Sequence, residues 1–519
     1  MLRILPLFVL LLLSSFPSVA QPAPPGIDSY TAAVLSAFEV PGIALAIVKD
    51  GRVVLAKGYG VRELGNPAPV DDRTLFGIAS NSKAFTATAL ALLVEEGRLG
   101  WEDRVIDHLP WFQLSDAFVT RELTIRDLLV HRSGLGLGAG DLLWWPASTY
   151  NRREVAERLR YLPLVTSFRS AYAYDNVLYL VAGEVIETLS GMSWEDFVQT
   201  RILDRVGMAD SNPRHSDAGA PGANVAVTHA RVDGVVRPIA PFTSDNTNPA
   251  GGINASARDI ARWMIVQLDS GRVAGDDRLF SRRTARELWT PLTPTPIGTP
   301  PPDLAPLQRQ FSGYALGFDV HDYRGHKVVT HTGGLPGYVS KVTMIPELKL
   351  GVAVFTNQES GRAFTAMTYH VLDHYLGAND TDWLVALANY EQQGLREIAD
   401  TEAAIATERN AGAGPSLSPA AYVGTYTDAW YGDILVEQKP DGALELRFSR
   451  TPSLVGSMEH WQYDTFIVRW YDRELRADAF ITFALHPDGS IDQARMQAVS
   501  PATDFSYDFQ DLLLKPAIR

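Results

Sequence analysis

Residues 76–83 read FGIASNSK and open an apolar segment that continues to Glu96. Apolar side chains recur there at helical spacing, at positions 85, 89, 92 and 93. This periodicity predicts a helix over residues 80–96. Because side chains three apart share a helix face, we expect the Lys83 amine within hydrogen-bond reach of the Ser80 hydroxyl. The stretch therefore predicts a serine nucleophile beside an amine base at the start of a helix.

The amine of Lys83 works as a base at neutral pH only if its pKa falls well below the usual value of about 10.4. A helix N-terminus opposes a second positive charge and stabilises an oxyanion near Ser80. The same spacing also arises by chance, as a helix cap followed by a solvated lysine. The motif therefore needs partners elsewhere in the chain before it indicates an enzyme.

A second candidate motif is Tyr174-Asp175-Asn176, directly before a predicted helix over residues 178–189. A phenol relays protons where cations lower its pKa, and an asparagine amide can orient both a lysine and a substrate carbonyl. The alternative is a core tyrosine followed by an asparagine that caps the helix.

A third candidate motif is His331-Thr332-Gly333-Gly334, which follows an apolar strand. The glycines allow a substrate backbone to approach closely. The Gly334 N–H is a candidate partner of the Ser80 N–H in an oxyanion hole. The alternative is a glycine-rich hairpin without a catalytic role.

The order of predicted elements indicates an α+β fold. Strands are predicted at 43–48 and 53–56, and again before the third motif, with helices at 125–130, 153–162, 178–189, 257–268 and 362–376. Strands at both ends with helices between them favour one antiparallel sheet carrying a helical subdomain. After residue 419 the pattern is nearly all strand, with Asp-Gly turns at 441–442 and 488–489 that predict hairpins. This favours a C-terminal all-β barrel or sandwich. We interpret its alternating apolar positions 461, 463, 466, 468 and 470, four of them aromatic, as one core strand.

The three motifs, in this order, resemble those of the serine β-lactamase and penicillin-binding-protein superfamily. The Tyr-x-Asn form is similar to the class C β-lactamase-related serine hydrolases, which include D-aminopeptidases and esterases, and the C-terminal module resembles the small lipocalin-like barrel appended to some of them. The resemblance implies a β-lactamase/transpeptidase-like fold with Ser80 as the acylated nucleophile and Lys83 and Tyr174 as the proton-transfer pair. Asn176 would position the lysine and the substrate amide, and the third motif would bind substrate.

His331 departs from the β-lactamase pattern, which places a lysine there. A histidine with a usual pKa of about 6.5 is mostly neutral at pH 7, whereas a lysine offers a permanent positive charge. We therefore expect carboxylate-bearing β-lactams to bind less well than in dedicated β-lactamases. The His-x-Gly form is more similar to that of D-aminopeptidases and other peptide or ester hydrolases.

Composition excludes several function classes. The 519 residues carry a formal net charge of −14, which argues against a nucleic-acid partner. Cysteine is absent, so disulfides, thiolate nucleophiles and Cys-ligated zinc are excluded. His370 and His374 lie four apart, but the pattern lacks the glutamate of a zinc protease, and we expect no metal and no cofactor. Trp144 and Trp145 are read as core more readily than as cleft residues.

The N-terminus predicts export. A short basic segment, an apolar run and Ser18-Val19-Ala20 give the layout of a signal peptide over residues 1–20. The alternative is an uncleaved anchor, although about 10 apolar residues are short for a bilayer core of about 30 Å. We expect a secreted or periplasmic protein with no stable membrane anchor after cleavage. The predicted parts are then a hydrolase domain at 21–408, a linker at 409–418 and the barrel at 419–519.

The leading functional hypothesis is an exported serine hydrolase that opens amide bonds of small peptides, D-residue-containing or derived from peptidoglycan, through a Ser80 acyl-enzyme. A carboxylesterase or β-lactamase of the same fold is the first alternative, with an ester or β-lactam as substrate. A non-catalytic protein that binds peptidoglycan fragments is the second. An oligomer is compatible with each.

Overall fold

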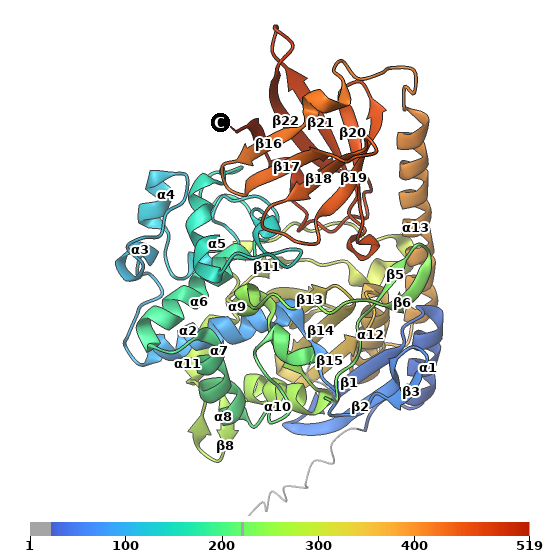
Figure 1. Ribbon diagram of the computed structural model, residues 1–519. Helices are drawn as coiled ribbons and strands as arrows, with labels where there is room; N and C mark the ends of the chain where they lie inside the picture. The colour runs from blue at the N-terminus through green and yellow to red at the C-terminus, as the bar shows by residue number, and fades with distance from the viewer. Residues whose placement is uncertain (1–21, 220–222, 518–519) are drawn as a thin grey trace, which may run out of the picture.

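A nine-stranded antiparallel sheet organises the larger domain in this computed structural model, which describes residues 22–219 and 223–517. The predicted signal peptide lies outside these residues. The strand order is β10-β11-β12-β13-β14-β15-β1-β2-β3 (Figure 1). In chain order the strands are β1 Gly42–Lys49, β2 Arg52–Glu63, β3 Asn66–Pro69, β10 Thr293–Pro294, β11 Ser312–Tyr314, β12 Asp319–Tyr323, β13 His326–Leu335, β14 Tyr338–Ile345 and β15 Leu350–Thr356.

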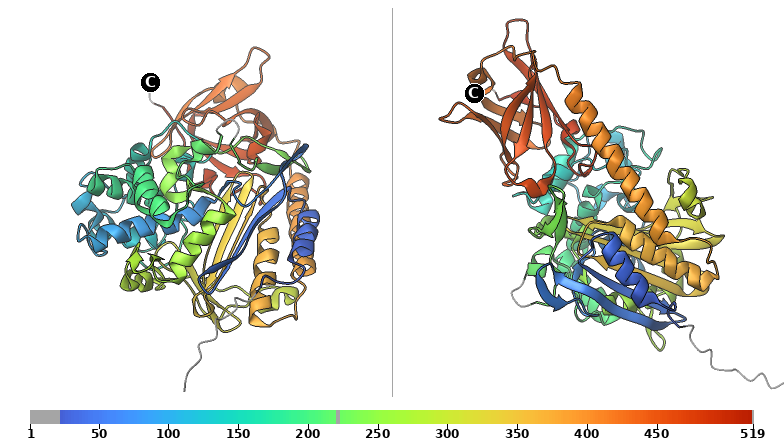
Figure 2. Two further views of the ribbon diagram at one scale, coloured as in Figure 1. Left: turned by 90° about the horizontal axis from the view of Figure 1, so that it is seen from below. Right: turned by 90° about the vertical axis from the view of Figure 1, so that its right-hand side faces the viewer.

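Helices cover both faces of this sheet, which explains why its central strands are continuously apolar. On one face lie α1 (Ile27–Ala37), α12 (Gly361–Leu376) and α13 (Trp383–Thr407), and on the other α10 (Ala257–Leu268) packs against β1 and β15 (Figure 2). Among the described residues, no helix combines the length and apolar character that crossing a membrane would need.

The second layer beside α10 is a helical subdomain around α2 (Lys83–Glu95) and α6 (Val177–Ser190), two helices packed together and lined by buried side chains. Its other helices are α3 Val105–His108, α4 Ala117–Glu122, α5 Arg152–Arg158, α7 Trp194–Val198, α8 Asp204–Val206, α9 Asn248–Gly251 and α11 Arg282–Leu288. Three two-stranded ribbons complete the domain: β4 Phe76–Gly77 with β7 Asn254–Ala255, β5 His229–Val232 with β6 Val235–Pro238, and β8 Arg272–Ala274 with β9 Asp277–Arg278.

The C-terminal domain is a nearly closed eight-stranded antiparallel barrel, in which a bridge between Ala494 and Leu514 joins the two ends of the sheet. Its strands are β16 Gly424–Asp428, β17 Gly432–Gln438, β18 Leu444–Phe448, β19 Val455–Gln462, β20 Thr465–Trp470, β21 Ala479–Leu485, β22 Ile491–Ala498 and β23 Lys515–Pro516. Both predicted Asp-Gly hairpins are confirmed. The predicted α+β fold with a helical subdomain and an all-β barrel is therefore confirmed.

Two local predictions are wrong, and one helix was not predicted. The apolar positions 461–470 form two strands instead of one, because the chain turns at Tyr463, which is 57% exposed. Residues 125–130 form only a 3₁₀ turn at Asp127–Leu129, since the Asp127 carboxylate accepts the Thr124 N–H and pairs with Arg132. The long helix α13 had no predicted counterpart, because most of its side chains are exposed and few of them pack into a core.

The barrel sits directly on the helical subdomain (Figure 1). Arg158 donates to the carbonyl of Trp430 at 2.9 Å, and Arg450 pairs with Glu154 at 3.0 Å. The helix α13 leads from the sheet to the barrel along one side of the molecule (Figure 2). The predicted linker region 409–418 follows its end and precedes β16.

Candidate active site

Ser80 lies in a tight turn between β4 and α2. The first helical turn, Ala79–Ser82, is 3₁₀ rather than α, and Ala79 has a left-handed φ of 49°. Two contacts fix this turn. Asn81 Nδ2 donates to Ser340 Oγ at 2.8 Å, and Ser82 Oγ accepts the Ile253 N–H at 3.0 Å. Non-glycine residues with a positive φ cluster at functional sites.

The Lys83 amine contacts three oxygens in the buried interior. Nζ lies 3.0 Å from Ser80 Oγ, 2.8 Å from Asn176 Oδ1 and 3.0 Å from the Ala250 carbonyl oxygen. A neutral amine has two protons and one lone pair, so it can donate to the two carbonyl oxygens and accept the Ser80 O–H. Burial lowers the pKa of Lys83 to about 7, although Asp141 and Asp175 act in the opposite direction. The environment therefore permits a neutral amine at physiological pH.

Asn176 connects the lysine to a buried carboxylate. Its Nδ2 donates to Asp141 Oδ2 at 2.8 Å while its Oδ1 accepts from Lys83. Burial raises the pKa of Asp141 to about 7. Asn176 occupies the N-cap position of α6, yet its side chain makes no capping hydrogen bond. Its amide is thus turned to the site.

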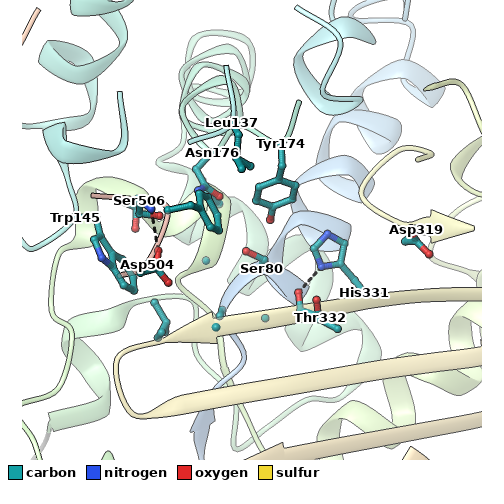
Figure 3. Close-up of a pocket in the computed structure, with 18 of the residues that line it drawn as sticks. Ser80, Leu137, Trp145, Tyr174, Asn176, Asp319, His331, Thr332, Asp504 and Ser506 are labelled. Carbon is teal, nitrogen blue, oxygen red and sulfur yellow. Dashed lines mark hydrogen bonds between the residues drawn. The ribbon is translucent and has the colours of Figure 1, made fainter. Parts of the chain in front are cut away.

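Tyr174 lies beside Ser80, with its hydroxyl directed toward the serine (Figure 3). Its ring packs on His131 at a centroid distance of 4.3 Å, and Lys83 Nζ lies 4.9 Å from its centroid. The expected condition of a lowered pKa is not met, because burial raises the pKa of Tyr174 well above its usual value. The phenol is therefore neutral and suited to donate a proton rather than to act as the first base.

The strand β13 forms the opposite wall of the site. His331 Nε2 accepts from the Tyr314 hydroxyl at 2.7 Å, and Nδ1 lies 2.5 Å from the Thr332 carbonyl oxygen, to which it donates. Burial, and then the charge of Lys83, lowers the pKa of His331 to about 3, so the imidazole is neutral. A Cβ at Gly333 would stand 2.3 Å from the Ile78 carbonyl oxygen, whereas one at Gly334 would meet nothing within 4 Å.

A cavity of about 410 Å³ joins the three motifs (Figure 3). Ser80, Tyr174, Asn176, His331, Thr332, Gly333 and Gly334 all line it, and Lys83 lies beneath its floor in contact with Ser80. The structure thus brings together every residue that the sequence predicted for the site. Trp144 and Trp145 are buried, as expected, and also line this cavity.

Other pocket residues had not been singled out from the sequence. Arg309, Asp319 and Lys341 lie along its wall, and Asp141 lies behind Asn176. Three consecutive residues come from the C-terminal barrel: Asp504, Phe505 and Ser506. Of these residues, only Lys341 could have been inferred from the third motif. It lies opposite Thr332 in the hairpin that β13 forms with β14.

The paired histidines of α12 lie away from this pocket. The ring of His370 stacks on Tyr30 with centroids 3.7 Å apart, and the ring of His374 packs edge-on against Tyr375. Both histidines therefore pack against neighbouring aromatic rings on the surface of this helix.

A serine that shares its proton with a buried amine, opposite a strand edge, is the arrangement of hydrolases that acylate a serine. The chain belongs to the β-lactamase family, whose family model matches residues 28–376. Residues 408–516 match a domain described only as a domain of unknown function, DUF3471.

The relatives include other hydrolases and penicillin-binding proteins. The unguisins hydrolase ungD of Aspergillus violaceofuscus is 29% identical over 475 residues, covering 83% of this chain and 80% of its own. An octameric penicillin-binding protein homologue from Pyrococcus abyssi superposes with a TM-score of 0.57 at 23% identity, over 94% of this chain and 99% of its own. The D-amino acid amidase of Ochrobactrum anthropi SV3 gives 0.55 at 20% identity, over 72% and 99%. These two structures share the fold.

Proposed function

We propose that this protein is an exported serine hydrolase that cleaves amide bonds of small peptides through an acyl-enzyme on Ser80. The observation that carries the proposal is the contact of Lys83 Nζ with Ser80 Oγ at 3.0 Å. Burial lowers the pKa of this amine to about 7, so that it can accept the serine proton. Export rests on the N-terminal segment, whose basic, apolar and small-residue parts are typical of a secretory signal.

Acylation begins when Lys83 accepts the Ser80 proton and Ser80 Oγ attacks the substrate carbonyl carbon. We assign the resulting oxyanion to the N–H groups of Ser80 and Gly334, two residues that line the same cavity. As the C–N bond breaks, the neutral Tyr174 phenol donates its proton to the leaving nitrogen and is reprotonated from Lys83. Water then attacks the ester carbonyl and gives a proton to the same pair. This proton passes to Ser80 Oγ as the ester C–O bond breaks, which releases the acid product and restores the serine.

Amide substrates are favoured by the protonation states in the site. An amine leaving group needs a proton donor, and a phenol whose pKa lies well above 10 retains its proton throughout the physiological range. The neutral His331 does not offer the fixed charge that a β-lactam carboxylate meets in dedicated β-lactamases. The relative named as an unguisins hydrolase supports a hydrolase, and the structure named as a D-amino acid amidase supports an amide substrate with a D-residue.

Labelling and turnover test the proposal together. Purified protein is treated with a fluorophosphonate and with a fluorescent penicillin, and intact mass is recorded before and after. One adduct is expected in the wild type and none in Ser80→Ala. A panel of D- and L-alanyl anilides, a p-nitrophenyl ester and a chromogenic cephalosporin then ranks the substrates, with anilides expected to depend fully on Ser80. Folded wild-type protein that takes no adduct from either reagent would reject the proposal.

A further inference from the structure

A second cavity, of about 1000 Å³, lies between the two domains. Its walls come from the β5–β6 ribbon, from α13 and from the barrel strands β19 and β20 with the turns that follow them. We call this space the interdomain chamber. Wall residues include Ala240 after the ribbon, Ala406 on α13 and Trp461 on the barrel. Parts of the chain more than 200 residues apart thus enclose one space.

The chamber adjoins the catalytic pocket, because the two cavities share part of their lining. Trp145, Gly334, Leu335 and Asp504 line both cavities, and we call these four residues the neck. Gly334 and Leu335 are the last residues of β13, the strand that forms the wall opposite Ser80. A chain lying along β13 from the nucleophile therefore reaches the chamber through the neck.

The chemistry of the site fixes which half of a substrate takes this path. Tyr174 and His331 lie on one side of Ser80, and Trp145 and Asp504 lie on the other (Figure 3). The leaving nitrogen must face the phenol that protonates it. The acyl half, which stays bonded to Ser80, must then extend toward Asp504 and the neck.

The four arginines of the chamber wall are all ion-paired, whereas its carboxylates Asp233, Glu402, Asp472 and Asp504 form no ion pair among the described residues. Arg476 pairs with Glu359 at 2.5 Å and Arg473 pairs with Asp478 at 2.6 Å, so these charges are matched within the wall. Apolar surface lies between them, from side chains such as Phe242, Ile405, Trp461 and Tyr507. A cavity of mixed lining whose unpaired charges are all carboxylates suits a ligand without negative charge that carries both apolar groups and hydrogen-bond donors, as a peptide does.

Asp504 provides a hydrogen-bond acceptor at the neck. Its carboxylate accepts the Ser506 N–H at 2.9 Å, and no lysine, arginine or histidine within the described residues forms an ion pair with it. An exposed carboxylate beside β13 can accept backbone N–H groups from an extended chain that passes it.

We propose that the interdomain chamber binds the acyl half of the substrate, a peptide segment of several residues without acidic side chains. The inference rests on the proposed function, because it needs Ser80 to be acylated. It makes the protein a hydrolase that opens a bond inside a peptide, rather than one that removes a single N-terminal residue. The barrel then serves as half of a substrate-binding site.

A ladder of acyl lengths tests the chamber. The probes are N-acetyl alanyl peptides with one, two, three and four residues before the scissile bond, in D and L series, each as a thiobenzyl ester. An activated thioester reports acyl binding without requiring amide cleavage. In the preferred series kcat/KM is expected to rise about tenfold or more along the ladder, since remote contacts contribute binding energy to the transition state.

Matched tryptophan variants locate the effect. Ala406→Trp and Ala240→Trp fill the chamber from two walls, and both alanines are exposed, so neither change disturbs a packed core. Ala404→Trp is the control, because Ala404 is also exposed on α13 but does not line the chamber. The two filling variants should remove most of the gain in kcat/KM for the longer probes and leave turnover of p-nitrophenyl acetate unchanged. The control Ala404→Trp should leave turnover of every probe unchanged.

The inference would be overturned if kcat/KM did not rise with acyl length in either series. It would also be overturned if Ala406→Trp and Ala404→Trp lowered kcat/KM for the longer probes equally. Fluorophosphonate labelling of Ser80 is measured on the same samples. Labelled protein whose kcat/KM does not rise with acyl length rejects the chamber alone, whereas protein that takes no label rejects the proposed function and the inference with it.

Discussion

Ser506 of the barrel donates a hydrogen bond to Asp141 of the hydrolase domain, with Ser506 Oγ 2.9 Å from Asp141 Oδ2. The same oxygen accepts from Asn176, which in turn binds Lys83. A continuous hydrogen-bonded chain therefore runs from the appended barrel to the amine beside the nucleophile. Asp508 strengthens the junction, because its carboxylate accepts the backbone N–H groups of Gly140 and Leu142 at 2.7 and 2.9 Å. The barrel is thus part of the support of the active site.

Removal of the Ser506 hydroxyl should slow the chemical step without unfolding the protein. A net contribution of about 1 kcal/mol for one buried hydrogen bond corresponds to roughly a fivefold fall in kcat/KM for Ser506→Ala. The measurement is steady-state turnover of an ester and an anilide. Ser500→Ala removes a hydroxyl from the same segment that binds exposed Glu402 instead, and it should keep wild-type kinetics. Equal rates in the two variants would show that the hydrogen bonds between Ser506 and Lys83 do not affect the rate of turnover.

The pH profile should report the Lys83 amine. Lys83 is active as a base when neutral, so kcat/KM should fall on the acid side with a midpoint near the pKa of about 7. Asp141 raises that pKa through its negative charge, so Asp141→Asn should move the acid limb to lower pH. Asp504→Asn is the control, because Asp504 lines the pocket but does not contribute to the Lys83 shift. An acid limb that moves upward in Asp141→Asn contradicts the assignment.

The sequence predicted the fold and the central residues because each rests on a local pattern. The spacing of Ser80 and Lys83 at a helix start is readable over four positions. The pairing of Asp141 with Ser506 is not, because these residues are 365 positions apart and meet only through docking of two domains. The turn that carries Asp141 and the loop that carries Ser506 have no periodicity that points to a pocket. The contacts that form only when the two domains dock therefore could not be predicted from the sequence.

Gly333 should be required for the approach of β13 to the serine turn. A Cβ there would stand 2.3 Å from the Ile78 backbone oxygen, which cannot move without shifting the turn that carries Ser80. Gly333→Ala should destabilise the fold by about 1–3 kcal/mol and reduce kcat/KM by about 100-fold. Thermal melting checks the first effect, with Gly334→Ala as the reference because its Cβ meets nothing within 4 Å. Melting temperatures that fall equally in both would disprove the steric account.

Loss of the Tyr174 hydroxyl should depend on the leaving group. Tyr174→Phe keeps the ring that packs on His131 but removes the proton donor, so anilide turnover should fall by about 10²–10⁴-fold. A p-nitrophenyl ester leaves as a stable anion and should be affected much less. Tyr172→Phe removes a second hydroxyl of the pocket wall and serves as the control. A uniform loss on both substrates in Tyr174→Phe would place the phenol in activation of the serine instead.

Lys341 should select substrates with a carboxylate on the leaving side. Lys341 lines the pocket on β14 opposite Thr332, with its Nζ 5.1 Å from the centroid of the Tyr369 ring. Burial, with Arg309 nearby, lowers its pKa to about 8, so it is mainly charged at pH 7. We expect the wild type to prefer a peptide with a free C-terminal carboxylate over its C-terminal amide by about tenfold, as a charged hydrogen bond provides. Lys341→Met should abolish the preference and leave turnover of the amide unchanged. Lys327→Met, on the exposed surface of β13, should retain it.

The pH dependence of this preference separates a charge effect from a shape effect. Lys341 loses its proton as pH rises through about 8, so the wild-type preference should decline above that value. Lys83 remains neutral over the same range, because its pKa is about 7, and turnover of the amide should therefore stay constant. A preference that persists at pH 10 would mean that the pocket selects the carboxylate by hydrogen bonds from neutral groups, such as Thr332, the partner of Lys341 in the strand pair.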